Sequence, residues 1–100
     1  MMELHVCNRK DGSFLKAFAL GDSDEIIIGR DETCDIRINA PTVSREHCAI
    51  EHRGEDLVLR DLGSTAGTFI AGDRVDSVPI RDGMEITVGP ALLKFYESGI

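Results

Sequence analysis

The sequence lacks the features that mark membrane-spanning, secreted and repeat-containing proteins. None of its uninterrupted apolar runs approaches the roughly 20 residues that a helix needs to span a bilayer. The first residues also lack the basic segment and apolar core of a secretory signal, because Glu3 and His5 interrupt the apolar residues almost at once. We find no internal repeat and no low-complexity segment. The sequence therefore predicts a protein of the cytoplasm or another intracellular compartment, with no membrane as its partner.

Cysteine is scarce, and the three thiols, Cys7, Cys34 and Cys48, form no closely spaced pair. An odd count without paired spacing argues against a disulfide framework, so reduced thiols are expected. His47 and His52 stand near Cys48, but neither a C-x-x-C motif nor the paired histidines of a zinc site occur. We expect Cys48 to pack in the core, and we expect no metal ion or other cofactor.

Basic residues are outnumbered by acidic ones, which gives a formal net charge of −7 and a pI of about 4.8. This balance disfavours nucleic acid and anionic membranes as partners, because both repel an acidic protein. A length of 100 residues with 42% hydrophobic content fits one core, so residues 1–100 are treated as a single domain. Any anion that this domain binds must be held locally by a few cations.

Short alternating or β-branched segments recur along the chain with turn residues between them, whereas no window has a clear helical period. This pattern predicts an all-β domain, either a sandwich or a barrel. The expected strands are Leu4–Asn8, Phe14–Ala19, Glu25–Gly29, Ile36–Ile38, His47–His52, Asp56–Asp61, Thr68–Ile70, Val75–Pro79, Glu85–Val88 and Leu92–Glu97.

Four short segments with glycine, residues 10–13, 53–56, 71–73 and 81–84, are expected to form hairpin connections. Three longer polar stretches separate other strands, at residues 31–34, 39–46 and 62–67. Longer loops are where binding groups usually lie. We therefore looked for binding chemistry in and beside these three stretches.

The first candidate is Arg30, which follows the apolar strand that ends at Gly29. The planar fork of donors on a guanidinium suits phosphate oxygens. An alternative is a surface ion pair between Arg30 and either Asp31 or Asp35, which would leave no free cation at this position.

The second candidate is the loop before the strand at His47, where Ser44 offers a hydroxyl beside the guanidinium of Arg45. The alternative is a local turn in which Ser44 caps backbone groups and Arg45 is solvated. The third candidate is Asp61–Phe69, whose glycines and small hydroxyl residues allow backbone N–H groups to approach an anion. A nucleotide-binding P-loop is excluded there, because no Gly-Lys-Ser/Thr follows.

In this order and spacing, Gly29-Arg30, Ser44–His47 and Asp61–Gly72 resemble the signature of the forkhead-associated (FHA) domain family, over about residues 3–97. The resemblance implies a two-sheet β-sandwich of about ten or eleven mostly antiparallel strands (FHA/SMAD-like), with binding loops at one end. It also implies a non-enzymatic module that binds phosphothreonine on a partner protein, such as a Ser/Thr kinase or its substrate. The isolated domain is expected to be a monomer.

The resemblance also assigns roles to individual positions. It implies that Arg30, Ser44, Arg45 and Thr65 bind phosphate. Residues expected to contact the peptide are Thr42, Val43, Ser64 and Ala66. A structural role is implied for Gly29, His47, Gly67 and Gly72, with the histidine joining neighbouring loops by hydrogen bonds rather than acting as a base.

Two positions depart from the family pattern, because members commonly carry asparagine where this chain has Ala66 and Ala71. Loss of an amide that bonds the ligand would cost about 0.5–1.5 kcal/mol, which weakens binding without abolishing it. The departures leave open an FHA-fold scaffold or oligomerisation module that binds partners independently of phosphate. A hydrolase built on Ser44, His47 and Asp61 is disfavoured, because no nucleophile elbow surrounds the serine.

Overall fold

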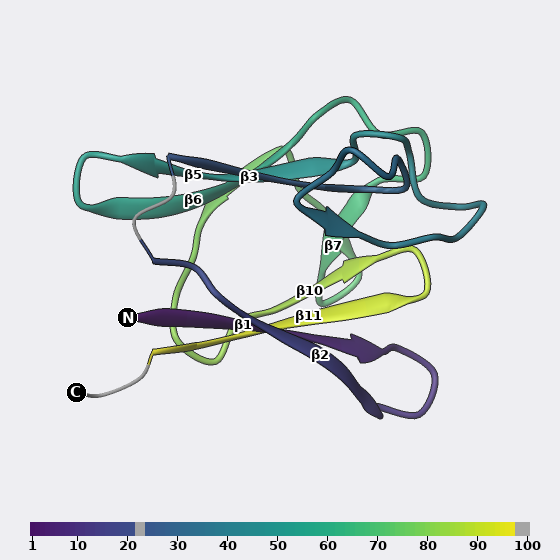
Figure 1. Ribbon diagram of the computed structural model, residues 1–100, viewed down its shortest axis with the longest axis horizontal. Helices are drawn as coiled ribbons and strands as arrows, with labels where there is room; N and C mark the ends of the chain where they lie inside the picture. Colours follow the sequence, from purple (N-terminus) through teal and green to yellow (C-terminus); the bar gives the residue numbers. More distant parts are fainter. Residues whose placement is uncertain (22–23, 98–100) are drawn as a thin grey trace.

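In a computed structural model the chain forms two β-sheets packed face to face, and the structure describes residues 1–21 and 24–97 (Figure 1). The first sheet contains β2 (Phe14–Ala19), β1 (Met2–Asn8), β11 (Ala91–Glu97), β10 (Glu85–Val88), β7 (Thr68–Ile70) and β8 (Asp73–Arg74), in that order. The second contains β4 (Ile36–Arg37), β3 (Glu25–Gly29), β5 (Cys48–Arg53), β6 (Asp56–Asp61) and β9 (Ser77–Pro79). The predicted all-β sandwich of mostly antiparallel strands is confirmed.

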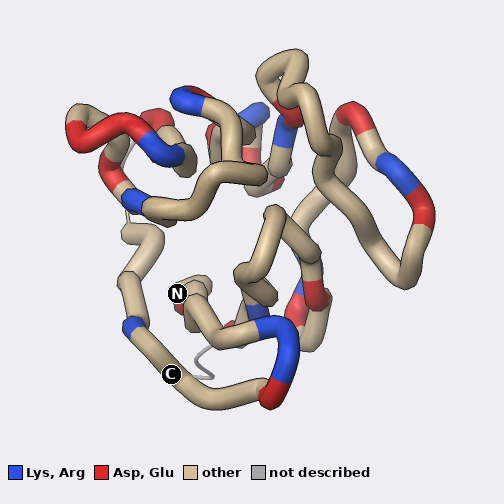
Figure 2. The backbone as a smooth tube through the Cα atoms, turned by 90° about the vertical axis from the view of Figure 1, so that its right-hand side faces the viewer, with Lys and Arg blue, Asp and Glu red and all other residues tan. Residues whose placement is uncertain are grey.

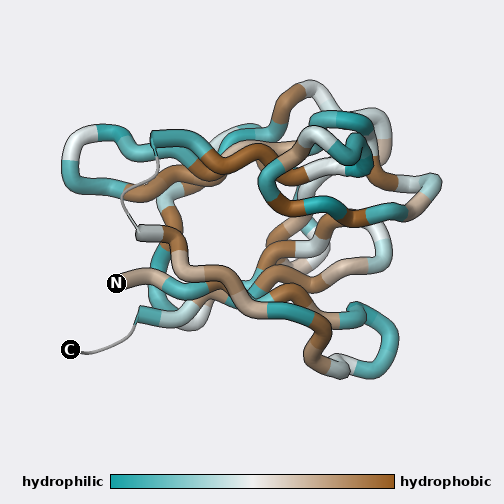
Figure 3. Tube along the Cα trace, in the orientation of Figure 1, coloured by the Kyte–Doolittle hydropathy of each residue, from teal (hydrophilic) through white to brown (hydrophobic). Residues whose placement is uncertain are grey.

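Alternation along the strands builds the core between the sheets. In β3, Ile26 and Ile28 are buried and lie opposite Ile50 and Cys48 of β5. Phe95 of β11, which belongs to the first sheet, is also fully buried. Each fully buried side chain of this size contributes about 1.5–3 kcal/mol. Figure 3 shows hydrophobic stretches on both sheets and hydrophilic residues at the turns, as this division requires.

Two details of the predicted connections are wrong. The strand expected at Val75–Pro79 begins only at Ser77, because the chain crosses from the first sheet to the second at residues 75–76. The turn at residues 81–84 is not a hairpin, since it links β9 in the second sheet to β10 in the first. The alternation of apolar residues marks both segments but carries no information about which sheet each one joins.

The three longer loops lie at one end of the sandwich, away from the N-terminus (Figure 1). Parallel pairing of β3 with β4 places Gly29 opposite Arg37, so residues 30–35 form a loop that returns the chain to the side of β3 and lets β4 run in the same direction. Within residues 1–21 and 24–97, the structure contains no helix with the length and apolar character required to cross a membrane.

The hairpin between β7 and β8 contains a strained alanine. Ile70 pairs with Asp73, so Ala71 and Gly72 form a two-residue turn, and both have positive φ, 49° and 85°. This is the pattern of a type I′ turn, in which asparagine is favoured at the first position. A left-handed conformation costs an ordinary side chain about 1–2 kcal/mol, whereas asparagine tolerates it.

We expect Ala71→Asn to raise the free energy of unfolding by about 0.5–1 kcal/mol, because it relieves this strain. Urea denaturation monitored by fluorescence of a bound dye or by circular dichroism measures the change. Ala66→Asn is the matched control, since Ala71 is the only non-glycine residue with positive φ in the described chain. Equal stabilisation by both substitutions would show that backbone strain is not the cause.

Candidate functional site

Arg30 and Arg45 are brought together by a close approach of two backbones. Arg30 N donates to Ser44 O at 2.9 Å, and Asp31 N donates to Arg45 O at 3.1 Å. The segment after β3 therefore runs alongside residues 44–45. Gly29 permits the approach, because a Cβ atom at this position would collide with the carbonyl oxygen of Arg45.

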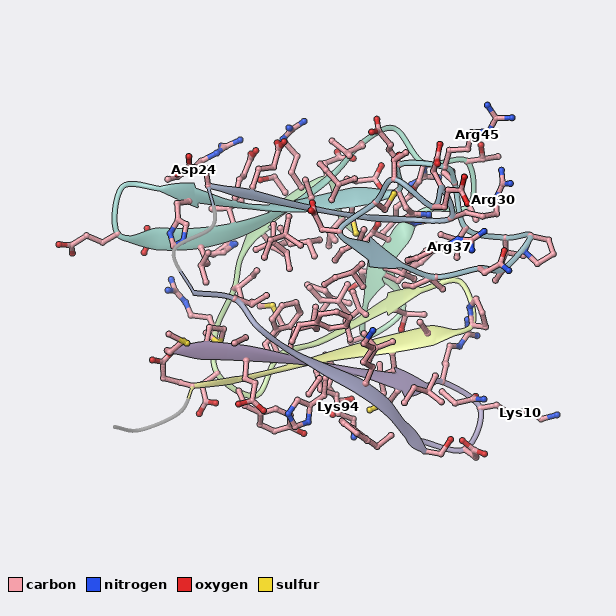
Figure 4. The ribbon with its side chains drawn as sticks, viewed as in Figure 1. Lys10, Asp24, Arg30, Arg37, Arg45 and Lys94 are labelled. Atoms are coloured by element: carbon pink, nitrogen blue, oxygen red, sulfur yellow. The ribbon has the colours of Figure 1, made fainter. Side chains whose placement is uncertain are left out.

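The Arg30 side chain is anchored at one atom and open at the others. Its Nε donates to Val43 O at 2.9 Å, and the residue is half-buried. Within the described chain, neither Arg30 nor Arg45 forms a salt bridge. The alternative of an ion pair with Asp31 or Asp35 is therefore wrong for the described residues. Figure 4 shows the side chains of Arg30 and Arg45 extending outward at the same end of the molecule.

Ser44 and Thr65 join two loops at the surface. The backbone N–H of Thr65 donates to Ser44 Oγ at 3.1 Å, across 21 positions of sequence. The hydroxyl hydrogen of Ser44 donates to no acceptor among the described residues, so it remains available to a ligand. Thr65 is exposed, and Ser44 is partly exposed.

His47 is fully buried and joins three segments. Its Nδ1 accepts the backbone N–H of Ser44 at 3.1 Å, and its Nε2 lies 2.9 Å from Gly67 O. An amide N–H can only donate and a carbonyl can only accept, so the ring carries its proton on Nε2. Both nitrogens are used by the backbone, and no bond links the ring to Ser44 Oγ. This geometry does not form a Ser-His-Asp triad.

Asp61 organises the loop that follows β6. Its carboxylate accepts the backbone N–H groups of Gly63 and Ser64, both at 3.0 Å. It also accepts the hydroxyls of Ser64 at 2.6 Å and Thr68 at 2.8 Å. Burial alone would raise the pKa of Asp61, but these hydrogen bonds outweigh it and hold the pKa below the ordinary value of 3.8.

These loops enclose one open surface depression with a volume of about 580 Å³. It is lined by Arg30, Pro41, Thr42, Val43, Ser44, Arg45, Thr65 and Ala66. All four residues expected to bind phosphate therefore line the same depression. Two arginines without a salt bridge in the described chain, together with a hydroxyl whose hydrogen has no acceptor there, give it the chemistry of a site for a small oxyanion.

The residues expected to contact a peptide are divided by the structure. Thr42 and Ala66 are exposed at the depression, but the side chains of Val43 and Ser64 are buried. The Ser64 hydroxyl donates to Asp61 and accepts the backbone N–H of Gly67 at 3.1 Å. Gly72 lies in the β7–β8 turn, outside the lining of the depression.

Two residues near the site were missed in the sequence analysis. Arg37 donates from Nε to the carbonyl oxygen of Arg30 at 2.9 Å, which places a third guanidinium beside the other two (Figure 4). A Cβ atom at Gly89 would lie 2.8 Å from Val43 Cγ2 and 2.9 Å from Thr42 Oγ1, so the absence of a side chain here allows Thr42 and Val43 to pack against the turn at Gly89. Arg37 reaches this position because β4 pairs in parallel with β3, which places Arg37 opposite Gly29. A single sequence does not show which strands pair.

The charges at this end are mixed rather than uniformly positive. Figure 2 shows Lys and Arg interspersed with Asp and Glu along the chain on this side. A hydrogen bond from the Thr33 backbone lowers the pKa of Asp31 and outweighs the opposing effect of burial, and the charges of Arg45 and Arg37 lower the pKa by smaller amounts. Asp31 therefore stays ionised beside the arginines. This end of the molecule therefore has no uniformly basic face.

The cysteines give no sign of a reactive or metal-binding centre. Burial raises the pKa of the Cys48 thiol to about 12, so this thiol stays protonated at neutral pH. All three cysteines are free thiols. Among residues 1–21 and 24–97, no group of three His, Cys, Asp or Glu side chains is arranged to hold a metal ion.

Fold and site together define a β-sandwich with a depression in the loops at one end that is lined by two arginines and several hydroxyl residues. The sequence model of the FHA domain family matches residues 26–89, so the chain belongs to the FHA domain family.

Two curated relatives of this chain are longer proteins. It is 40% identical over 74 residues to proliferation marker protein Ki-67 of Mus musculus, a match that covers 73% of this chain and 2% of the relative. It is 34% identical over 67 residues to glycogen accumulation regulator GarA of Mycolicibacterium smegmatis, covering 67% and 42%. The chain therefore spans a small part of the first relative and less than half of the second.

Solved structures share the whole fold. The FhaA FHA domain, solved in complex with the intracellular domain of Rv3910, is 27% identical with a TM-score of 0.80, covering 95% of this chain and 99% of that one. EmbR of Mycobacterium tuberculosis, solved with a low-affinity phosphopeptide, is 26% identical with a TM-score of 0.80. That match covers 96% of this chain and 24% of EmbR.

The lowered pKa of Asp61 gives its contribution to stability a defined pH dependence. The ionised carboxylate stabilises the fold above pH 3.8, and the contribution is lost as the pH falls through the lowered folded-state value. We expect Asp61→Asn to lower the free energy of unfolding by about 2 kcal/mol at pH 7, because charged hydrogen bonds become neutral ones.

Chemical denaturation of both proteins at pH 7, 5 and 3 measures this difference. We expect the gap between them to narrow toward pH 3, where the carboxylate of the unfolded chain is protonated. If the difference in free energy of unfolding stayed constant over this pH range, the charge of Asp61 would not be the source of its contribution to stability.

Proposed function

We propose that this domain binds phosphothreonine on a partner protein. The observation that carries the proposal is the convergence of Arg30, Arg45 and Ser44 on one open depression, with no salt bridge to either arginine in the described chain. A cation that a protein leaves unpaired beside a free hydroxyl has no evident packing role. A phosphate dianion would satisfy all of these donors at once.

Each residue has a distinct part in the proposed complex. Arg30 uses Nε to hold Val43 O, so its terminal nitrogens face the ligand in a fixed orientation. Ser44 donates its hydroxyl hydrogen to the phosphate, and the exposed guanidinium of Arg45 donates to it from the same loop. Thr65 contributes its hydroxyl, since its backbone N–H is already bonded to Ser44. Binding then consists of charge-assisted hydrogen bonds, and no covalent bond is made or broken.

Peptide contacts next to the phosphate fall to Thr42 and Ala66 in this proposal. Val43 and Ser64 act through the loops that they shape, because their side chains are buried. Ala66 has no amide to hold the peptide backbone, so affinity is lower by roughly 0.5–1.5 kcal/mol than with an asparagine there. The positive charge of the depression comes from Arg30 and Arg45 and does not depend on these four residues.

The relatives support the same class of function. The FhaA FHA domain was solved with a protein partner, and EmbR was solved with a phosphopeptide. For this chain we propose a phosphothreonine-containing protein, such as a Ser/Thr kinase or its substrate, as the partner of a monomeric domain. Three free thiols fit a reducing intracellular compartment. Arg-based recognition of phosphorylated motifs is the shared physical principle.

Arg30→Ala should weaken binding to a degenerate phosphothreonine peptide pool by tenfold or more, because it removes the oriented guanidinium. Fluorescence anisotropy with labelled peptide measures the loss. Arg30→Lys should recover only part of it, since a lysine has no planar fork. We expect a small decrease in melting temperature as well, because the bond from Nε to Val43 is lost.

Arg53→Ala is the matched control, since Arg53 pairs with Glu51 on β5 and lies outside the depression. The unphosphorylated pool is the second control. Binding that needs neither phosphate nor Arg30 would support the phosphate-independent module instead. The alanines at 66 and 71 would then be the reason for the change.

Binding should also strengthen as the pH rises through about 6, the second pKa of a phosphorylated side chain. Below that value the ligand carries one negative charge instead of two, while the arginines stay charged. Anisotropy titrations at pH 5.0 and 7.5 should differ several-fold, with melting curves at both pH values showing an intact fold. Equal affinities would indicate that one charge is sufficient and that the ligand is not bound as a dianion.

A further inference from the structure

Arg74 reaches the loop of residues 62–67 from outside the depression described above. It lies on β8, opposite Phe69 of β7, and its Nη2 atom donates to the carbonyl oxygen of Ser64 at 2.9 Å. β7 lies at the same end of the molecule as the three longer loops (Figure 1). Arg74 does not line the depression, and it forms no salt bridge within the described chain. Its positive charge is therefore directed at a backbone carbonyl group.

Gly67 makes room for the guanidinium of Arg74. A Cβ atom at this glycine would lie 3.1 Å from Arg74 Nε and 3.0 Å from two atoms of the Phe69 ring. Its φ of 97° also lies in the left-handed region, which glycine adopts at no steric cost. Gly67 therefore keeps the side chain of Arg74 close to the loop.

A single peptide group connects Arg74 to Ser44. The carbonyl of Ser64 and the N–H of Thr65 belong to the same planar peptide group. Its oxygen accepts the bond from Arg74 at 2.9 Å, and its N–H donates to Ser44 Oγ at 3.1 Å. Because the carbonyl and the N–H of a trans peptide point in opposite directions, Arg74 and Ser44 hold this peptide group from opposite sides. Two hydrogen bonds in series thus link an arginine outside the depression to a hydroxyl inside it.

The Ser64 carbonyl depends on Arg74 for its hydrogen bond. The N–H and the hydroxyl of Ser64 both donate to Asp61, at 3.0 Å and 2.6 Å. Among the residues that the structure describes, no donor other than Arg74 reaches the carbonyl oxygen of Ser64. Ser64 is only 4% exposed, so water has little access to replace the arginine. Loss of the guanidinium would therefore leave this peptide group weakly held on one side.

Hydrogen bonds in series strengthen one another. A cation at the carbonyl oxygen polarises the peptide group, which makes the Thr65 N–H a stronger donor to Ser44 Oγ. A hydroxyl oxygen that accepts such a bond becomes a better donor through its own hydrogen. The Thr65 N–H occupies one lone pair of Ser44 Oγ, so the hydroxyl hydrogen is directed away from Thr65. That hydrogen has no acceptor among the described residues, as noted for the site itself.

We propose that Arg74 is a positioning residue of the phosphate-binding depression. It acts through the peptide group between Ser64 and Thr65, which orients the hydroxyl of Ser44 toward the ligand and strengthens it as a donor. Arg74 itself does not touch the ligand. The inference rests on the proposed phosphothreonine binding. The charge of a third arginine, placed behind the loop, then supports the two arginines that face the phosphate.

The first test needs no ligand. In NMR spectra of the free domain, the amide proton of Thr65 should shift upfield in Arg74→Ala, because its bond to Ser44 weakens. The Gly63 amide lies in the same loop but donates to Asp61 at 3.0 Å, so it should shift much less. Arg74→Lys should restore part of the Thr65 shift, since lysine keeps the charge but lacks the planar fork.

Phosphopeptide binding supplies the second test. Arg74→Ala should weaken binding to the phosphothreonine peptide pool about three- to fivefold, measured by fluorescence anisotropy. In a Ser44→Ala background the same substitution should have no further effect, because the hydroxyl through which it acts is absent. In an Arg45→Ala background the loss should persist, since Arg45 makes no contact with the peptide group between Ser64 and Thr65.

Asp73→Ala is the matched control. Asp73 precedes Arg74 on β8 and is also exposed, but it makes no hydrogen bond to the loop of residues 62–67 within the described chain. This variant should leave the Thr65 amide shift and the affinity unchanged. Melting curves of all variants establish that the fold is intact. Should Arg74→Ala not fold, Arg74→Gln, which loses the charge and keeps a polar side chain, takes its place with the same expectations.

The outcomes separate this inference from the proposed function. An unchanged Thr65 amide in Arg74→Ala overturns the inference, whatever the domain binds. An equal loss of affinity with and without the Ser44 hydroxyl would show that Arg74 acts by another route, which also overturns it and leaves phosphothreonine binding in place. If the intact domain binds no phosphothreonine peptide, the proposed function fails, and the role of Arg74 in binding fails with it even when the Thr65 amide shifts as expected.

Discussion

The buried imidazole of His47 holds the loop end of this domain in place. One nitrogen accepts the backbone N–H of Ser44, and the other donates to the carbonyl of Gly67. The backbone of His47 also bonds to Ile28 and Leu62, so a single residue links β3, the loop before β5 and the loop after β6. Because an unpaired polar group is costly inside a protein, these loops have little freedom to separate.

The same network explains how an acidic chain can present the proposed anion site. The net charge of −7 acts over long distances, where salt screens it, whereas the arginines act at contact distance. The bond from Nε to Val43 and the close approach at Gly29 keep Arg30 and Arg45 beside each other. In the proposed complex, an oxyanion between the two guanidinium groups would offset their mutual repulsion.

Stability and recognition are carried by largely different groups. The core is apolar and lies between the sheets, and the Asp61 carboxylate stabilises its loop by accepting hydrogen bonds from Ser64 and Thr68. Apart from the buried Val43, the residues that line the depression are exposed or half-exposed and contribute little to packing. Such a division lets the surface residues at Thr42 and Ala66 vary among members of a fold without loss of the fold itself.

The sequence by itself determined most of the strands, the apolar residues of the core and the residue types of the proposed phosphate site, because alternation, turn glycines and the order of Arg30, Ser44 and Arg45 are local properties. Only the tertiary structure decided which sheet each strand joins, that Val43 and Ser64 are buried, and that Arg37 stands beside Arg30. These facts depend on pairing and packing between segments far apart in the chain. Local patterns record which residues prefer burial, but they do not record the partner against which each one is buried.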